Sequence, residues 1–361
     1  MTRTFYFLVV LILSLSQSYA KVIRVDNNEG ASADYIKLQN AINNADPGDS
    51  IYVVGSPNYY DTNTQGRLVE IRLNKEVIII GPGYFLGENN NTQFNKQTAK
   101  VYQINIGEGA DNSILTGLDF NASSSSYINI NRERLDGSQG NNSPNNITIT
   151  RNIIDELYIY HASNTLVERN YISTNVNPIF LDETSSRSVI RNNILRSGNR
   201  YATIYGDFQG VLSNTVISNN TLTNGLYRIR GATIQNNIFI TGGFNDCDDN
   251  NVKNNIFTTV EDAVFPENST ANDAENNIFG AVQANLFIAP TPSLDRDFQL
   301  ADQSPARGIG IDGVDAGAFG GTSPYKISGL PGIPAIYDLT TSGIGTPTDG
   351  MSVTIKARSH N

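Results

Sequence analysis

The sequence predicts an all-β protein, a right-handed parallel β-helix in which the chain winds repeatedly through short strands. Three observations lead to this prediction. They are a repeat of about 21 residues, an asparagine at one fixed position of the repeat, and apolar residues on both sides of that asparagine. A repeat of this length is typical of solenoids, so residues 21–321 are expected to form one continuous β-helix.

Seven segments between residues 149 and 279 share the frame apolar–x–x–Asn–x–apolar. Residues 115–120 fit the same frame with Leu118 in the asparagine position. The units have no 3.6-residue period, which excludes a helical solenoid. The asparagines of the seven segments are Asn152, Asn170, Asn193, Asn220, Asn237, Asn255 and Asn277.

Each frame predicts two short strands that meet at a corner and face one core. The residue before the repeated asparagine is usually a second asparagine, such as Asn192 or Asn219, and asparagine tolerates the left-handed backbone of a tight corner. The repeated asparagine is expected to point inward, where its amide can bond the coils above and below. Such a ladder satisfies buried polar groups only when the coils stay in register.

The two ends of the repeat region differ from its middle. Apolar residues between positions 35 and 45 recur at helical spacing and predict a short amphipathic capping helix, which would cover the open edge of the first coil. Pro47 and Gly48 end that helix, and a strand follows at 51–54. Residues 322–361 contain prolines that break the repeat, and they are expected to cover the last coil or to be disordered.

Residues 1–20 have the pattern of a signal peptide, with Arg3, an apolar run over 5–15, and small residues at Ser18 and Ala20. Cleavage after Ala20 and a secreted or periplasmic location are therefore expected. The whole chain has 25 Lys+Arg and 35 Asp+Glu, a net charge of −10, which argues against nucleic acid and anionic membranes as partners. The single cysteine, Cys247, cannot form an internal disulfide, so a large core must stabilise the fold.

Three passages resemble the right-handed β-helix proteins of the pectate-lyase-like superfamily, of the secreted bacterial type. These are residues 38–53, the Asn-Asn repeats, and residues 297–319, which together span most of residues 22–321. The resemblance implies the fold and leaves the chemistry open, because this fold hosts lyases, hydrolases, esterases and non-catalytic binding proteins.

The resemblance also implies two kinds of catalytic machinery. Lyases of the group neutralise a uronate carboxylate with calcium or arginine and use Arg, Lys, His or Tyr as base, whereas hydrolases need two or three carboxylates. Neither set can be mapped onto this sequence. The two histidines, His161 and His360, do not lie between glycines, and His161 is expected to be a solvated loop residue.

The middle of the chain has an unusual charge. Between residues 132 and 230 all ten cations are arginines, against eight acids, while the rest of the chain is strongly acidic. Arg151 and Arg169 occupy the same corner position in successive repeats, which places their backbones about 4.8 Å apart. Like charges this close need an acid or an anionic ligand between them. Glu168 could be that acid. The alternative is a ligand site, whose candidate residues are Arg151, Arg169, Arg191, Glu168 and Tyr171.

Asp246, Asp248 and Asp249 lie in one loop between two coils. Three nearby carboxylates could bind calcium, although their spacing is not that of an EF-hand. An acidic solvated loop is the alternative interpretation. No other cofactor is indicated by the sequence.

These observations predict a secreted β-helix protein that binds a carbohydrate polymer, and an acidic polysaccharide is one candidate. One alternative is a polysaccharide lyase or glycoside hydrolase acting on an acidic polysaccharide, with the lyase favoured over the hydrolase. The other is a non-catalytic structural or surface-interaction protein.

Overall fold

A computed structural model describes residues 20–121, 126–131, 143–182, 185–198, 202–207, 211–212, 214–270, 272–343, 345–348 and 350–359. The predicted signal peptide, apart from Ala20, and His360 lie outside these ranges. None of the helices within the described ranges is both long and apolar enough to cross a membrane.

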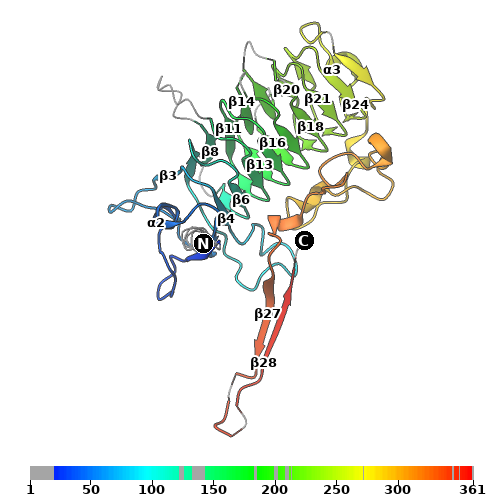
Figure 1. Ribbon diagram of the computed structural model, residues 1–361. Helices are drawn as coiled ribbons and strands as arrows, with labels where there is room; N and C mark the ends of the chain where they lie inside the picture. Colours follow the sequence, from blue (N-terminus) through cyan, green and yellow to red (C-terminus); the bar gives the residue numbers. More distant parts are fainter. Residues whose placement is uncertain are drawn as a thin grey trace, which may run out of the picture.

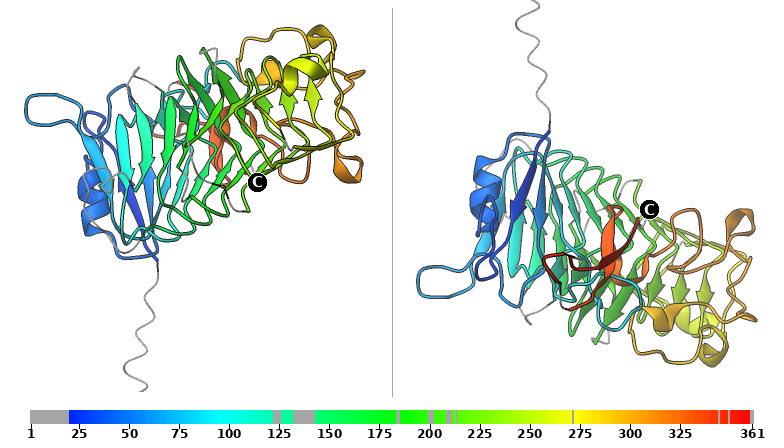
Figure 2. Two further views of the ribbon diagram at one scale, coloured as in Figure 1. Left: turned by 90° about the horizontal axis from the view of Figure 1, so that it is seen from above. Right: turned by 90° about the horizontal axis from the view of Figure 1, so that it is seen from below.

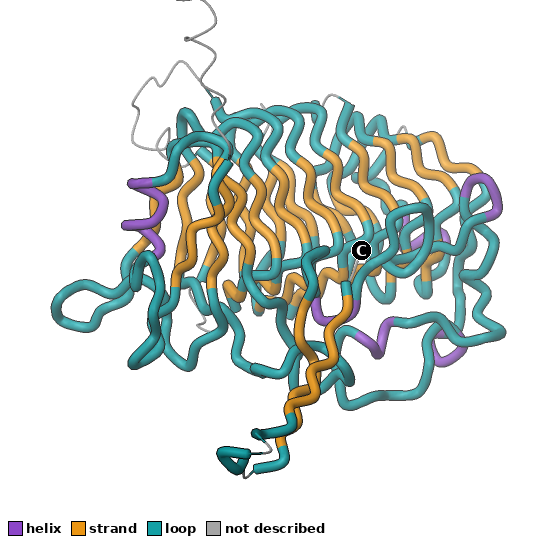
Figure 3. The backbone as a smooth tube through the Cα atoms, turned by 60° about the horizontal axis from the view of Figure 1, so that its bottom comes forward, coloured by secondary structure: helices purple, strands orange, loops and turns teal. Residues whose placement is uncertain are grey.

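The chain is a right-handed parallel β-helix, as predicted (Figures 1 and 2). Among the described residues its coils build three parallel sheets of 11, 7 and 8 strands, named here sheets A, B and C. Figure 3 shows the strands as regular rows joined by loops. Helix α2 (Leu38–Asn44) lies at the end of the stack where the chain begins, with Leu38, Ala41 and Ile42 buried.

The strands are short because each coil must turn several times. Sheet A contains β1 (Val22–Val25), β2 (Asp49–Val53), β4 (Val77–Ile80), β6 (Ile114–Thr116), β9 (Thr148–Thr150), β12 (Leu166–Glu168), β15 (Val189–Arg191), β18 (Val216–Ser218), β21 (Thr233–Gln235), β24 (Asn251–Lys253) and β26 (Asp273–Glu275). Sheet B contains β7 (Asp119–Phe120), β10 (Ile153–Ile154), β13 (Tyr171–Thr174), β16 (Ile194–Ser197), β19 (Thr221–Leu222), β22 (Ile238–Phe239) and β25 (Ile256–Phe257). Sheet C contains β3 (Glu70–Leu73), β5 (Gln103–Ile106), β8 (Tyr127–Ile130), β11 (Glu156–Ile159), β14 (Ile179–Leu181), β17 (Ile204–Gly206), β20 (Leu226–Tyr227) and β23 (Phe244–Asn245).

The core is a stack of inward-facing apolar side chains at matching positions of successive coils. In sheet A, for example, Leu115, Ile149 and Val167 are paired in register and are fully buried. Burial of this kind is the main stabilising contribution in a fold without disulfides, at about 25 cal/mol per Å² of apolar surface. The free thiol of Cys247 is also buried, and burial raises its pKa to about 12.

The corner between sheets A and B carries a continuous line of asparagine amides. Asn237 accepts hydrogen bonds at Oδ1 from the backbone N–H and the side chain of Asn220 (2.8 and 3.0 Å), and its own amide donates to Asn255 Oδ1 and to the Ile217 carbonyl oxygen (3.0 and 2.8 Å). The line ends at Leu118, whose N–H donates to Asn152 Oδ1 at 3.0 Å. Each amide therefore joins neighbouring coils and fixes their register.

The residue before each ladder position adopts the left-handed backbone conformation that the corner requires. This holds for Arg151 and Arg169 (φ +56° and +58°) as well as for the asparagines at the same corner of later coils. The side chains of these residues point outward, so they form a second column, the corner column. Its members are Arg151, Arg169, Asn192, Asn219, Asn236, Asn254 and Asn276, and Gly117, which has no side chain, occupies the same corner of an earlier coil.

After β26 the chain turns back and runs along the outside of sheet B toward the first coils. This returning segment, residues 286–330, includes the 3₁₀ turns η3 (Arg296–Phe298), η4 (Ile311–Gly313) and η5 (Ile327–Gly329). Its apolar residues pack against the outward residues of sheet B, such as Ile194, Ile238 and Ile256. Sheet B is therefore buried on both faces, which explains its continuous apolar strands.

The coils therefore end earlier than the boundary expected at residue 321. The expected tail, residues 322–361, does not lie on the last coil either. Ser323 contacts Arg169 and Leu330 contacts Arg151, both in the middle of the stack. Beyond them, β27 (Ala335–Thr341) and β28 (Val353–Arg358) form an antiparallel hairpin that projects from the body (Figures 1 and 3).

Candidate functional site

Two of the three arginines expected to bind a ligand hold the returning segment instead, and the third pairs with Glu168. Arg151 is 9% exposed, and its Nη1 donates to the carbonyl oxygen of Leu330 at 2.9 Å. Arg169 donates from Nε to the carbonyl oxygen of Ser323 at 3.1 Å and from Nη2 to its hydroxyl. Arg191 forms an ion pair of 2.8 Å with Glu168.

This geometry removes the open arginine face on which the ligand prediction depended. Glu168 also lies 3.6 Å from Arg169, so one carboxylate neutralises two arginines and no anionic ligand is required. Tyr171 is 2% exposed, and its hydroxyl accepts a hydrogen bond of 2.7 Å from Arg196. Sequence spacing correctly placed Arg151 and Arg169 at one corner, but it could not reveal the chain segment that covers them.

The aspartates expected to bind calcium are paired with arginines. Asp246 forms ion pairs of 3.2 and 3.0 Å with Arg228 and Arg230, and Asp248 lies 3.5 Å from Arg230, while Asp249 is exposed. In the part of the chain that the structure describes, no three His, Cys, Asp or Glu side chains come close enough to hold a metal ion. Asp246 and Asp248 thus balance local cations, and calcium binding by this loop stays a prediction.

The outward face of sheet C carries a feature of a different kind, a column of aromatic rings. Tyr158, Phe180, Tyr205 and Tyr227 are paired in register on β11, β14, β17 and β20, one ring on each of four successive coils. Ring centroids are 6.2, 5.7 and 5.1 Å apart along the column. All four side chains are half-buried, so part of each ring faces solvent.

Tyr160 adds a further ring beside the Tyr158 end of this aromatic column. Its ring lies nearly parallel to that of Tyr158, with centroids 6.1 Å apart, and 5.2 Å from that of Phe180. At the other end the guanidinium of Arg228 lies 4.6 Å above the Tyr227 ring and donates to the Tyr205 hydroxyl at 3.1 Å. Asp246, through its ion pair, helps to hold Arg228 in that position.

An acidic pocket adjoins the Tyr158 end of the column. It has a volume of about 390 Å³, and its lining includes Asn121, Asp155, Glu156 and Thr174. Burial raises the pKa of both carboxyls. Asp155 is 6% exposed, and its Oδ2 is buried without a hydrogen-bond partner in the structure.

Glu156 links this pocket to the aromatic column. The Tyr158 hydroxyl donates a hydrogen bond to Glu156 Oε2. Burial, together with this carboxylate, raises the pKa of Tyr158, so the phenol stays protonated and is a donor rather than a base. The pocket therefore presents a carboxyl group that binds a proton more readily than an exposed one, beside the rings of the aromatic column.

His161 lies at the opposite end of β11 from Glu156. Its Nδ1 is 3.1 Å from Asp182 Oδ2, and its side chain is 30% exposed. His161 therefore lies in a partly exposed loop position, with its imidazole beside a buried carboxylate. The aromatic column has acidic groups at one side of β11 and a histidine–aspartate pair at the other.

The sequence contained a signal for the column. Each ring follows an inward apolar residue in a two-residue alternation, as in Leu157-Tyr158-Ile159 and Ile179-Phe180-Leu181. The asparagine frame marks sheets A and B but not sheet C, whose strands follow loops of different lengths. The shared position of the four rings is therefore visible only in the folded chain.

Comparison with solved structures shows a low level of similarity to several proteins. No protein-family model and no curated protein matches the sequence. Among solved structures it is similar to the PL6 family alginate lyase AlyGC (13% identity, TM-score 0.41), covering 72% of this chain and 38% of that one. It is also similar to an alginate lyase from Paenibacillus sp. str. FPU-7 (12%, TM-score 0.29, 72% and 97% covered) and to a pectate lyase (14%, TM-score 0.30, 84% and 93% covered). The match thus spans little more than a third of the length of AlyGC.

Proposed function

We propose that this is an exported protein that binds a carbohydrate polymer along the aromatic column of sheet C. The observation that carries the proposal is the recurrence of one aromatic ring at the same strand position on four successive coils, at Tyr158, Phe180, Tyr205 and Tyr227. Aromatic rings contact the apolar faces of sugars, and their hydroxyls add hydrogen bonds.

The column suits a repeating ligand because it is itself repeating. Its rings are spaced by the separation of adjacent parallel strands, about 4.8 Å per coil. The rings project from hydrogen-bonded strands whose inward neighbours, such as Leu157 and Ile204, are buried. Their positions are therefore fixed before a ligand arrives, which lowers the entropy cost of binding.

The charges beside the column favour a neutral polymer over an acidic one. The expectation of an acidic polysaccharide depended on Arg151, Arg169 and Arg191, which bond the returning segment and Glu168. At the column itself Arg228 is paired with Asp246, and Asp155 and Glu156 lie at the other end. The cation at the column is thus already neutralised by a carboxylate, which makes it a poor partner for the uronates of an acidic polymer.

Cleavage of the bound polymer is the second candidate function, and the acidic pocket is the observation that favours it. A carboxyl whose pKa is raised by burial can remain protonated and donate a proton to a glycosidic oxygen. We propose Glu156 as that donor, because it contacts Tyr158 of the column directly. Its replacement, Glu156→Gln, should abolish cleavage and leave binding of the polymer intact.

A panel of soluble polysaccharides tests both candidates. Calorimetry of the purified exported protein should show binding to a neutral glucan or related neutral polymer and weaker binding to alginate and pectate. New reducing ends without new unsaturated ends would indicate hydrolysis, and unsaturated ends would indicate a lyase. No binding to any member of a broad panel would contradict the proposal. The intact mass of the exported protein tests separately whether the chain begins after Ala20.

A further inference from the structure

The C-terminal hairpin, β27 and β28, has one apolar face and one polar face. Its register places Leu339 opposite Ile355, Thr341 opposite Val353, and Ile336 opposite Ala357, so these residues share one face. The other face carries Thr340 opposite Thr354 and Asp338 opposite Lys356, and the latter two form an ion pair of 2.6 Å. One face is thus apolar and the other is polar.

The apolar face is not covered by the rest of the described chain. Every residue of β28 is exposed, and Figure 1 shows the ribbon extending away from the coils. An isolated two-stranded ribbon is marginally stable in water, so a hairpin of this kind gains most of its stability from something that packs on it. The large apolar side chains that face solvent here are Phe94 (56% exposed), Ile336 (46%), Leu339 (37%), Met351 (52%), Val353 (47%) and Ile355 (56%).

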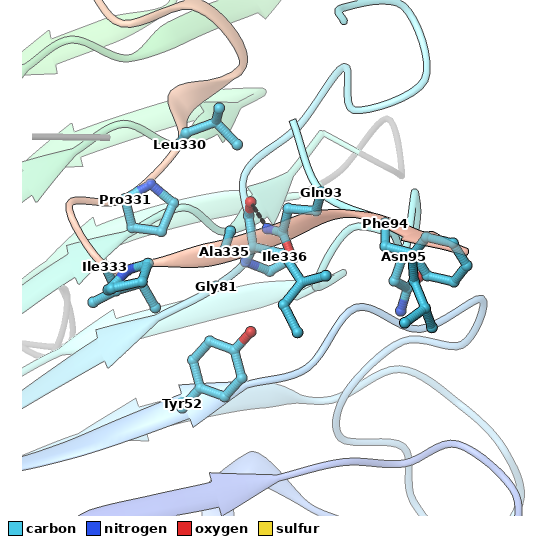
Figure 4. Close-up of a pocket in the computed structure, with 13 residues that line it drawn as sticks. Tyr52, Gly81, Gln93, Phe94, Asn95, Leu330, Pro331, Ile333, Ala335 and Ile336 are labelled. Carbon is cyan, nitrogen blue, oxygen red and sulfur yellow. Dashed lines mark hydrogen bonds between the residues drawn. The ribbon is translucent and has the colours of Figure 1, made fainter. Parts of the chain in front are cut away.

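The apolar face continues into a pocket at the base of the hairpin (Figure 4). This pocket has a volume of about 370 Å³, and Tyr52, Phe94, Pro334, Ile336 and Leu339 are among its lining residues. The N–H of Phe94 donates to the Ile336 carbonyl oxygen at 2.8 Å, which fixes the base of the hairpin to the body. The hairpin and the pocket therefore form one contiguous apolar surface, and a hydrogen bond holds the base of the hairpin to the body.

We propose that this surface binds a second copy of the chain, so that two hairpins pack apolar face on apolar face about a two-fold axis. The six exposed side chains form an apolar patch on the order of 500 Å². A stable interface needs about 800 Å² per partner, so the proposed dimer requires the pocket rim and the backbone of each hairpin to contribute the rest of the buried area. In a two-fold arrangement each copy provides the flat, uncharged, apolar partner that the other one lacks.

The charge distribution is compatible with this pairing. The whole chain has a net charge of −10, so two bodies in contact would repel one another. Residues 335–358 contain two acids, Asp338 and Asp349, and two bases, Lys356 and Arg358, so the hairpin region is neutral. A projecting neutral hairpin allows contact between copies while the acidic bodies stay apart.

Two neighbouring residues on opposite faces give a matched test. Ile355→Asp places a charge in the proposed interface, whereas Thr354→Asp places the same charge one residue away on the polar face. Sedimentation of the exported protein over a range of concentrations should show a monomer–dimer equilibrium for the wild type. Ile355→Asp should weaken dimerisation at least about tenfold, since an unpaired charge would be buried, and Thr354→Asp should leave it unchanged.

Thermal melting of both variants should match the wild type, because the hairpin lies outside the core, and this separates loss of pairing from loss of folding. A wild type that is monomeric at all concentrations would overturn the proposal, as would equal weakening by the two substitutions. A dimer that survives Ile355→Asp would place the interface elsewhere. Polysaccharide binding does not enter this test, so its outcome is independent of the function proposed for sheet C.

Discussion

Arg151 and Leu330 are separated by 179 residues in the chain and joined by a hydrogen bond of 2.9 Å from a guanidinium nitrogen to a carbonyl oxygen. The bond belongs to a series along the corner column. Asn192 donates to the carbonyl oxygens of Ala318 and Gly320, and further contacts join Asn219 to Asp315 and Asn254 to Ile309. Corner residues of later coils contact lower-numbered residues of the returning segment, so the segment runs antiparallel to the direction of the coils. The corner column therefore fastens that segment over sheet B.

Removing one set of these hydrogen bonds should weaken the packing of the returning segment on sheet B. Arg169→Ala deletes the bonds to Ser323 and should lower the free energy of unfolding by about 1–3 kcal/mol. Arg187→Ala is the matched control, because Arg187 is an exposed corner arginine with a similar left-handed backbone (φ +53° against +58°). Limited proteolysis should cut Arg169→Ala faster within residues 318–330 and leave the control unaffected. Equal rates would argue against the fastening role.

The asparagine ladder should contribute more than an exposed asparagine of the same coils. Asn237→Ala leaves the Asn220 amide and the Ile217 carbonyl oxygen without this partner, at a cost of about 1–3 kcal/mol for each buried group left unpaired. Asn251→Ala, on the exposed side of β24, should cost less than about 0.5 kcal/mol. Urea titrations of the two variants measure the difference. Coincident midpoints would contradict the assignment of register control to the ladder.

The buried carboxyl of Asp155 should make stability fall as pH rises. Burial raises its pKa above the unfolded value of about 3.9, so the folded chain binds this proton more tightly than the unfolded chain. Below the unfolded pKa the group has no effect. As the pH rises through the folded pKa, its ionisation in a buried place costs stability. Asp155→Asn should therefore raise the melting temperature by a few degrees at pH 7 and not at pH 3.

Asp302→Asn is the control for this pH effect. It removes one carboxyl, as Asp155→Asn does, but the Asp302 side chain is exposed to solvent. The Asp302 variant should melt close to the wild type at both pH values. A gain for Asp155→Asn that is the same at pH 3 and pH 7 would show that ionisation is not its cause.

The parts of the fold that depend on short-range pattern could be predicted from the sequence. The corner residues Asn192 and Asn219 were expected in the left-handed conformation, and both adopt it, because the requirement is set by the repeat frame itself. The position of helix α2 likewise follows from local periodicity.

The parts that depend on distant contacts could not be predicted. The arginine-rich corner looked like an open ligand face because nothing in residues 322–330 indicates that they return to Arg151 and Arg169. The alignment of the aromatic column could not be predicted for a related reason. Tyr205 and Tyr227 align only when the loops between coils are folded, and the loop lengths differ from coil to coil.

The most direct test of the account is the affinity of single tyrosine variants for the polymer that the wild type binds. Tyr205→Ala removes a ring from the middle of the column, and Tyr52→Ala removes a ring of sheet A that lines the pocket at the hairpin base. Isothermal titration should show a dissociation constant raised about fivefold or more for Tyr205→Ala, because one stacking contact of about 1 kcal/mol is lost. The dissociation constant of Tyr52→Ala should be unchanged. Wild-type affinity in a folded Tyr205→Ala protein would contradict the claim that the polymer lies on this face.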